Sequence, residues 1–266
     1  MPMPELSVVE ASSRREFLSH ALMPGLSLGL VGGLVACSST PKVLTGDFTE
    51  QLKGTAWEGW EEKHFPTKRV TQYELLKDDK GREVIRASAQ GSASMLRKRL
   101  DIAPEQLGQI RFSWMAEKMS DEADVAEADA TDAVVRVLLA FDGDRSKWSA
   151  KDSMLGELSR LLMGEEMPYA TLVYAWCTKG LRRSVVINPR TPTVRNYLLE
   201  AGMQKIGQWR HYRRNIRRDY EHIFGEPPGK LVSIGLMTDA DNTNSHAVGW
   251  YGPLSLGPLE AISPRM

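Results

Sequence analysis

The strongest constraint on the fold is a series of short segments rich in β-branched and aromatic residues, separated by Gly, Pro and Asp. Such segments predict β-strands with turns between them. The sequence Asp78-Asp79-Lys80-Gly81 is typical of a hairpin turn between two of them. We therefore predict a mainly β fold from about ten strands, an antiparallel sandwich or barrel. The expected strands cover residues 68–76, 83–89, 94–100, 109–117, 133–141, 170–177, 184–187, 208–216, 231–237 and 247–254.

Two segments interrupt the strands with a helical pattern. Residues 217–224 predict a short helix, which ends at Gly225 before two prolines. Residues 152–164 predict a second helix that ends at Gly164 and carries its leucines on one face: Leu155, Leu158, Leu161 and Leu162. Residues 120–132 are rich in Ala, Asp and Glu and are interpreted as a solvated loop.

The first 36 residues have the three parts of an export signal. Arg14 and Arg15 supply the positive charge, an apolar run covers residues 21–36, and Leu34-Val35-Ala36 leads to Cys37. The run is shorter than the roughly 20 residues that a membrane span needs, so a cleaved signal is favoured over an uncleaved anchor.

Two resemblances sharpen this interpretation. Ser13-Arg14-Arg15-Glu16-Phe17-Leu18 resembles the twin-arginine export motif, although Ser19 stands where that motif often has Lys. Leu34-Val35-Ala36-Cys37 is similar to the lipobox of bacterial lipoproteins, which implies lipidation of Cys37. Ser38 follows instead of Asp, and by resemblance to the sorting rule of such proteins this implies the periplasmic side of the outer membrane.

Charge and cysteine content narrow the partners. Lys+Arg and Asp+Glu both number 34, so the chain has no net positive charge that would suggest binding to nucleic acid. Contact with the membrane is expected through the lipid. Twin-arginine substrates fold in the reducing cytoplasm, where disulfides are rare. Cys177 is therefore expected to be a small buried side chain without a disulfide. The expected organisation is a signal over 1–36, a tether over 37–54, a β-sandwich over 55–256 and a tail over 257–266.

Several short motifs in the mature part resemble an uncharacterised bacterial family, domain of unknown function 3047. The most specific are Asp219-Tyr220 followed by Phe224-Gly225-Glu226, and Met237-Thr-Asp239-Ala-Asp241-Asn242-Thr243. The resemblance covers roughly residues 55–256 and implies a jelly-roll-like sandwich similar to carbohydrate-binding modules. It implies no activity. The acidic loop and the helix over 152–164 depart from the family pattern and look like insertions.

One candidate ligand surface is the aromatic face of the strand over 170–177. Tyr174 and Trp176 alternate onto one face, which suits stacking on a sugar ring, or a second layer of core. Arg136 lies within an apolar alternation and therefore needs a partner. Asp219, Asp239 or an anionic ligand would serve.

The second candidate surface is basic. Trp209, His211, Arg213 and Asn215 would share one face of a strand, and Trp with Arg suits acidic sugars or phosphates. The alternative is a solvated edge strand, because Arg blunts sheet edges.

A third group of residues suggests calcium. Asp239, Asp241 and Asn244 place several hard oxygens in one loop, as Ca²⁺ prefers. The alternative is a set of Asx turns that satisfy their own backbone.

Catalytic motifs are weak. Glu122, Asp124 and Glu127 have the Glu-x-Asp-x-x-Glu spacing of some sandwich-fold glycoside hydrolases, but their flanks favour a solvated loop. We therefore expect a lipid-anchored protein that binds a glycan or another envelope polymer without catalysis. A glycan hydrolase or lyase and a structural envelope protein without a small ligand are the alternatives.

Overall fold

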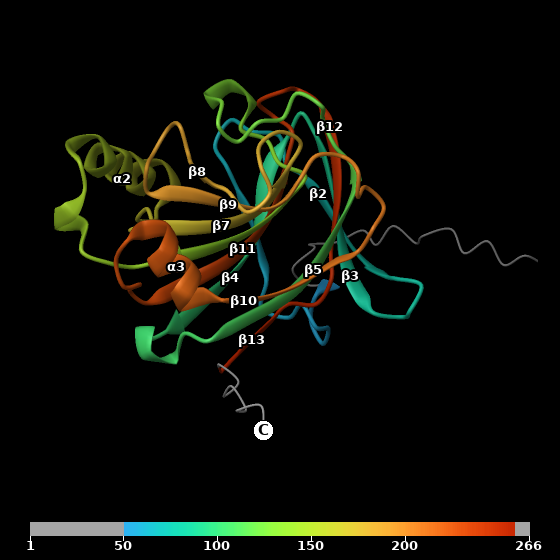
Figure 1. The fold of residues 1–266 in the computed structure, drawn as a ribbon, viewed down its shortest axis with the longest axis horizontal. Helices are drawn as coiled ribbons and strands as arrows, with labels where there is room; N and C mark the ends of the chain where they lie inside the picture. Colours follow the sequence, from blue (N-terminus) through green and yellow to red (C-terminus); the bar gives the residue numbers. More distant parts are fainter. Residues whose placement is uncertain (1–50, 259–266) are drawn as a thin grey trace, which may run out of the picture. The chain divides into compact units, whose positions relative to one another are not determined.

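A computed structural model describes residues 51–258, which form two β-sheets packed face to face (Figure 1). Sheet A has seven strands, in the order β1 (Glu61–His64), β4 (Ala93–Ile102), β11 (Leu231–Asp239), β6 (Val135–Phe141), β7 (Ala170–Cys177), β9 (Val194–Ala201) and β8 (Val185–Ile187). Sheet B has the order β10 (Arg210–Asn215), β5 (Gln109–Lys118), β12 (His246–Tyr251), β3 (Glu83–Gln90) and β2 (Gln72–Lys77), and β13 (Ser255–Gly257) also pairs with β5. The predicted β-sandwich is confirmed.

The strand pairs are antiparallel except for β7 with β9, which is parallel. The exception arises because β8 lies between them in sequence but pairs with the far side of β9. After β7 the chain forms β8 at the edge of the sheet and then returns as β9, which lies between β7 and β8. The predicted hairpin turn joins β2 to β3, with Gly81 in the left-handed region at φ +73° and its N–H bonded to the Asp78 carbonyl.

Two α-helices carry the caps that their sequences indicate. Ser149 caps α2 (Ala150–Met163) by accepting a hydrogen bond from the Asp152 N–H, and Asn215 caps α3 (Ile216–Phe224) in the same way. Both helices end at a glycine in the left-handed conformation. Short 3₁₀ helices lie at η1 (Pro104–Gln106), η2 (Ala128–Ala130) and η3 (Arg145–Lys147). None of the helices within residues 51–258 is both long and apolar enough to span a membrane.

The core lies between the sheets and is rich in aromatic side chains. Trp114 and Tyr251 from sheet B and Phe141 and Trp176 from sheet A are almost fully buried. Leu52 is also fully buried, so the packed body includes part of the segment expected to be tether. Cys177 is a buried free cysteine, as predicted.

Some local predictions were wrong. The strand expected from residue 68 begins at Gln72, and β1, β9 and β13 were not predicted. Residues 194–201 lack a clean alternation, because β9 is covered on both faces over much of its length. The leucines of α2 share a side, but that side is largely exposed: Leu158 46%, Leu161 77% and Leu162 61%.

Candidate functional site

The main candidate site is a groove on the outer face of sheet A, the face turned away from sheet B. Two adjoining cavities of about 250 and 480 Å³ lie along it and share Phe65, Leu138 and Val194. Alternation along the strands explains the position, since Val137 and Leu139 of β6 enter the core while Leu138 points outward. We call this surface the sheet A groove.

The floor of the groove is mainly apolar. Met95, Leu138, Val194 and Met237 come from four different strands of sheet A, and all are partly buried. Phe65 follows β1 and is the aromatic residue lining both cavities in the described part of the chain. An apolar floor with polar groups at its ends is the usual composition of a ligand site.

One end of the groove, which we call the Glu165 end, gathers basic side chains around the carboxylate of Glu165, and Glu61 is a second carboxylate that contacts two of them. Arg97 donates to both oxygens of Glu165, at 2.5 and 3.2 Å. Arg99 donates to Oε1 at 2.5 Å, and Lys63 Nζ lies 3.3 Å from the same atom. The hydrogen bond from Arg97 is the largest influence that lowers the pKa of Glu165 to about 2. Glu165 is therefore ionised at neutral pH.

The opposite end, the Asp239 end, holds a buried ion pair. Arg136 Nη1 lies 2.5 Å from Asp239 Oδ2, and the Arg136 guanidinium also donates to the Thr131 carbonyl. Arg136 is 8% exposed and Asp239 3%. Burial raises the pKa of Asp239 to about 6, although Arg136 acts in the opposite direction. The prediction that Arg136 needs a partner is confirmed, and of the alternatives the partner is Asp239 rather than Asp219.

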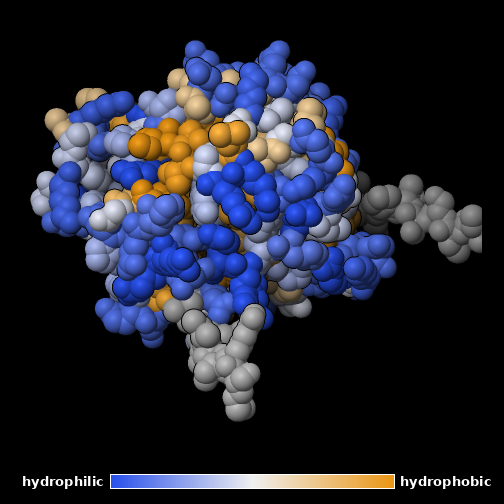
Figure 2. All heavy atoms as spheres, in the orientation of Figure 1, coloured by the Kyte–Doolittle hydropathy of each residue, from blue (hydrophilic) through white to orange (hydrophobic). Residues whose placement is uncertain are grey.

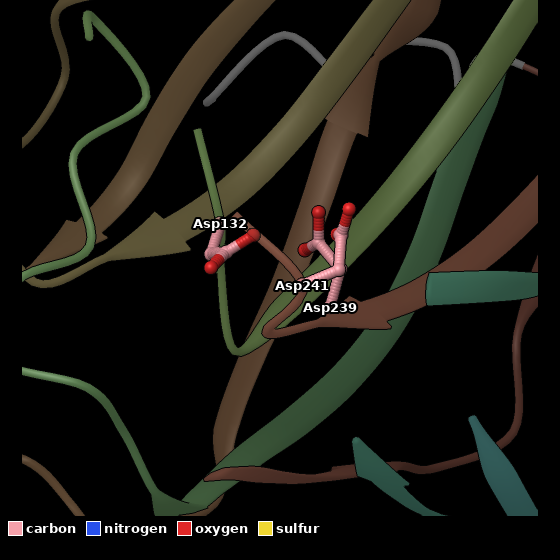
Figure 3. Close-up of side chains that lie close together, drawn as sticks. All are labelled: Asp132, Asp239 and Asp241. Atoms are coloured by element: carbon pink, nitrogen blue, oxygen red, sulfur yellow. The ribbon is translucent and has the colours of Figure 1, made fainter. Parts of the chain in front are cut away.

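Three carboxylates cluster at this end, those of Asp132, Asp239 and Asp241, with one oxygen of each within 4.8 Å of the others (Figure 3). Asp132 was not among the predicted ligands. Asn244 accepts instead from Arg69, at 3.4 Å, and has a positive φ of 46°.

Hydrogen bonds already use all the oxygens of this cluster. Asp132 accepts from the backbone and side chains of Asn242 and Thr243, which hold its pKa below the usual value against the effect of burial. Asp241 accepts from Lys68 at 2.5 Å and from Asn242 at 3.4 Å, and Asp239 accepts from the Ala133 N–H besides Arg136. A calcium ion here would compete with two cationic side chains. The predicted alternative was Asx turns within the loop, but Asp132 and Asp239 accept instead from segments distant in sequence.

Tyr174 and Trp176 belong to the core rather than to a ligand surface, which corrects their predicted role. Both are 0% exposed, so neither can stack on a sugar. The Tyr174 hydroxyl donates to Asp219 at 2.8 Å, and the Trp176 indole donates to the Gly202 carbonyl at 2.9 Å. The opposite face of β7, with Val173, leads into the groove.

The predicted basic surface lies outside the sheet A groove, on sheet B. Arg213 and its neighbours lie on β10, an edge strand of sheet B, as the alternative prediction had it. The Asn215 side chain caps α3, and Asp219 pairs with Arg214 at 2.6 Å. Trp209 is partly buried beside Arg82. These residues do not line the groove with Arg136.

The weak catalytic motif lies in a loop, as its flanks predicted, and not on the strand that a pair of carboxylates on one face would require. Glu122 and Glu127 are exposed, and the Asp124 side chain accepts the Ala126 N–H in a turn. The loop is partly packed, because Ala123 and Val125 are buried against the outer face of sheet A.

Sequence reasoning missed the Glu165 end. The sequence did contain one indication of this end: Arg97 and Arg99 are two residues apart on an expected strand, so they share a face. Glu165 follows α2 and no sequence pattern connects it to them.

A separate apolar patch lies at the edge of sheet A. Hydrophobic surface gathers where β8 and β9 lie in the same view (Figure 2), and the exposed apolar residues there include Val185 and Ile187. This patch is outside the groove.

Comparisons with known proteins give a family and several distantly similar structures. No curated protein matches the chain. The family 11 carbohydrate-binding module of the cellulase Lic26A-Cel5E of Clostridium thermocellum is similar with a TM-score of 0.37 and 13% identity, covering 77% of this chain and 91% of that one. The xyloglucanase domain of NopAA from Sinorhizobium fredii has a TM-score of 0.36 and 8% identity, covering 74% and 92%. Similarities this weak do not identify a ligand. The profile of the family described as protein of unknown function (DUF3047) matches residues 58–255, and the chain belongs to that family.

Proposed function

We propose that this chain is a lipid-anchored envelope protein that binds a polysaccharide, or another envelope polymer, along the sheet A groove without cutting it. The observation that carries the proposal is the groove itself, two adjoining cavities with an apolar floor and hydrogen-bonding groups at both ends. Sugar rings present an apolar face and a polar rim, which match such a surface. Phe65 is positioned to contact a ring where the two cavities meet.

The charges of the groove support binding rather than hydrolysis. A glycoside hydrolase needs one carboxyl that gives up a proton and a second that acts as base or nucleophile. Glu165 is neutralised by three cationic side chains, and Asp239 by Arg136. Each carboxylate would have to leave its cationic partner before it could take such a role.

A hydrolase remains the second candidate because of one observation. Asp239 has a pKa raised to about 6 and lies close to Asp241, which is the combination of an acid and a base expected of a catalytic pair. Both residues line the groove.

The anchor is the second part of the proposal. Its support is the order of the twin-arginine motif, the apolar run and the lipobox before Cys37. Radiolabelled palmitate is expected to mark the wild-type protein and not Cys37→Ser. Equal labelling of both would contradict the anchor. Changing Arg14 and Arg15 to Lys is expected to retain the precursor in the cytoplasm, whereas normal export would indicate the general secretory route.

Binding is tested by affinity electrophoresis in gels that contain envelope and extracellular polysaccharides, together with an assay for new reducing ends. Phe65→Ala is expected to lose retardation in the gel. The matched control is Trp250→Ala, which removes a partly buried aromatic residue stacked beside Arg86 on sheet B. Equal loss of retardation in both variants would contradict the groove as the polysaccharide-binding site.

The same assay separates the alternatives. Reducing ends that disappear in Asp239→Asn or Asp241→Asn would replace the binding function with the hydrolase. Reducing ends lost instead in Glu122→Gln and Glu127→Gln would restore the motif in the loop. Absence of binding across the whole panel would favour a structural envelope protein.

A further inference from the structure

The Glu165 end has the geometry of a carboxylate-binding site that is occupied by a carboxylate of the chain itself, that of Glu165. The Arg97 guanidinium contacts both oxygens of Glu165, the forked arrangement by which Arg recognises carboxylates. Arg99 and Lys63 approach Oε1 of the same group. Three cations thus contact one partly exposed carboxylate, and exposed ion pairs of this kind contribute little to stability.

Removing the Glu165 carboxylate would leave a positive site. Glu61 is the other acidic side chain that contacts Arg97 and Arg99, with Arg97 Nη2 at 2.6 Å and Arg99 Nε at 3.5 Å from its Oε1. The charges of Lys63, Arg97 and Arg99 against Glu61 sum to 3 − 1 = +2. An incoming anion would restore the present balance, whereas a neutral group would not.

Glu165 is also placed where an incoming ligand can replace it. It belongs to the short connection between α2 and β7, next to Gly164, which ends the helix at φ +67°. Its side chain is 31% exposed, and that of Arg99 is 64% exposed. The carboxylate lines the larger cavity, beside the apolar floor. A ligand lying in the groove would therefore meet the Glu165 carboxylate directly.

We propose that the polymer bound in the groove is acidic, and that Lys63, Arg97 and Arg99 receive a sugar carboxylate in the place that Glu165 occupies in the unliganded chain. This inference rests on the proposed binding function and names the class of its ligand. Glu165 is thereby an internal competitor. Its removal frees the site for the ligand, and esterification of the ligand removes the group that the site receives.

The test measures binding of one oligosaccharide in two forms, an oligogalacturonate and its methyl ester, by calorimetry on the mature protein. Wild-type protein is expected to prefer the acid. Glu165→Gln is expected to bind the acid about tenfold more tightly, equivalent to about 1.4 kcal/mol, with no change for the ester. Arg99→Gln, a change at an exposed position, is expected to weaken binding of the acid form by about tenfold.

The matched control is Glu226→Gln. Glu226 is 29% exposed and is held by Lys147 at 3.0 Å and by the Tyr169 hydroxyl at 2.8 Å, but it does not line the groove. This variant is expected to bind the acid as wild type does. A purely structural role for Glu165 predicts some loss of stability in Glu165→Gln and no gain in affinity for the acid.

The failures are distinguishable. Equal binding of acid and ester, or unchanged or weaker binding by Glu165→Gln, would overturn the inference and leave groove binding intact. Binding of neither form, together with no binding of any polysaccharide in the electrophoresis panel, would overturn the proposed function itself.

Discussion

The two ends of the sheet A groove contain the same chemical pair in different surroundings. At each end an Arg nitrogen lies 2.5 Å from a carboxylate oxygen. The Asp239 side chain is 3% exposed, whereas that of Glu165 is 31% exposed. Contact distance alone would give both pairs the same role. Burial separates them, because a buried charge without its partner is costly and an exposed one is hydrated by water.

The difference follows from where each carboxylate lies in the fold. Asp239 ends β11, and Arg136 lies opposite Met237 on the neighbouring strand, so the sheet fixes both partners. Glu165 lies on a connection outside the sheet. The Asp239 end is therefore interpreted as a fixed part of the fold, and the Glu165 end as an exchangeable contact.

The largest expected effect comes from breaking the buried pair. Arg136→Gln is expected to lower the free energy of unfolding by about 3–5 kcal/mol, because Asp239 would be left buried without its charged partner. Urea denaturation measures the change. Arg99→Gln is the matched variant at the other end, with an expected loss of about 1 kcal/mol or less. Similar losses in both variants would remove the contrast between the two ends.

A smaller loss of unfolding free energy is expected from a substitution in the core beneath the groove. Tyr174→Phe removes the hydroxyl that donates to Asp219 and should cost about 1–3 kcal/mol. Burial raises the pKa of Tyr174 well above its usual value, so the hydroxyl stays protonated and able to donate. Ligand affinity should not change, since Tyr174 has no exposed surface. A loss of affinity with unchanged stability would return Tyr174 to the ligand site.

The pH dependence of stability sharpens the comparison at the Glu165 end. The folded-state pKa of Glu165, about 2, lies below the usual value of 4.5 for a glutamate, so the ionised form stabilises the fold. That contribution is present above about pH 4.5 and is lost as the pH falls through about 2. The difference in unfolding free energy between wild type and Glu165→Gln, about 1 kcal/mol or less because the pair is partly exposed, should shrink from pH 6 to pH 3. A constant difference would contradict an ionic role.

The smallest expected effect is that of calcium at the Asp239 end. Because hydrogen bonds already satisfy the carboxylates of Asp132, Asp239 and Asp241, millimolar Ca²⁺ should leave the melting temperature unchanged. Saturating a real site a hundredfold above its Kd would add about 2.7 kcal/mol of stability. A rise that disappears in Asp239→Asn with Asp241→Asn would establish the calcium site.

The sequence predicted the strands better than it predicted which of their faces binds. The bounds of β7 agree with the prediction, because its apolar run is uninterrupted, but its aromatic face turned out to be core. Alternation shows that Tyr174 and Trp176 share a face and does not show what covers it. The parallel insertion of β9 and the approach of Glu165 to Arg97 depend on contacts distant in sequence, which local patterns do not encode.

That Arg136 needs a partner was predictable for a physical reason, because an Arg within an apolar alternation cannot stay buried without one. The choice of Asp239 over Asp219 or an anionic ligand depends on the pairing of β6 with β11, which the sequence did not show. Asp132 was missed because it is the last residue of the loop over 120–132, whose composition indicated only solvation, although Asp132 is 1% exposed and accepts four hydrogen bonds.

Binding along the sheet A groove is tested most directly by methyl NMR during titration with the oligosaccharide that the mature chain retains best. The methyl groups of Met95, Leu138 and Val194 line the groove. Those of Met154 and Ile187 are 62% and 52% exposed outside it. Shifts at the first three with none at the other two are the expected result. Shifts confined to Met154 or Ile187 would place the ligand on α2 or on the β8 edge and contradict the groove as the binding site.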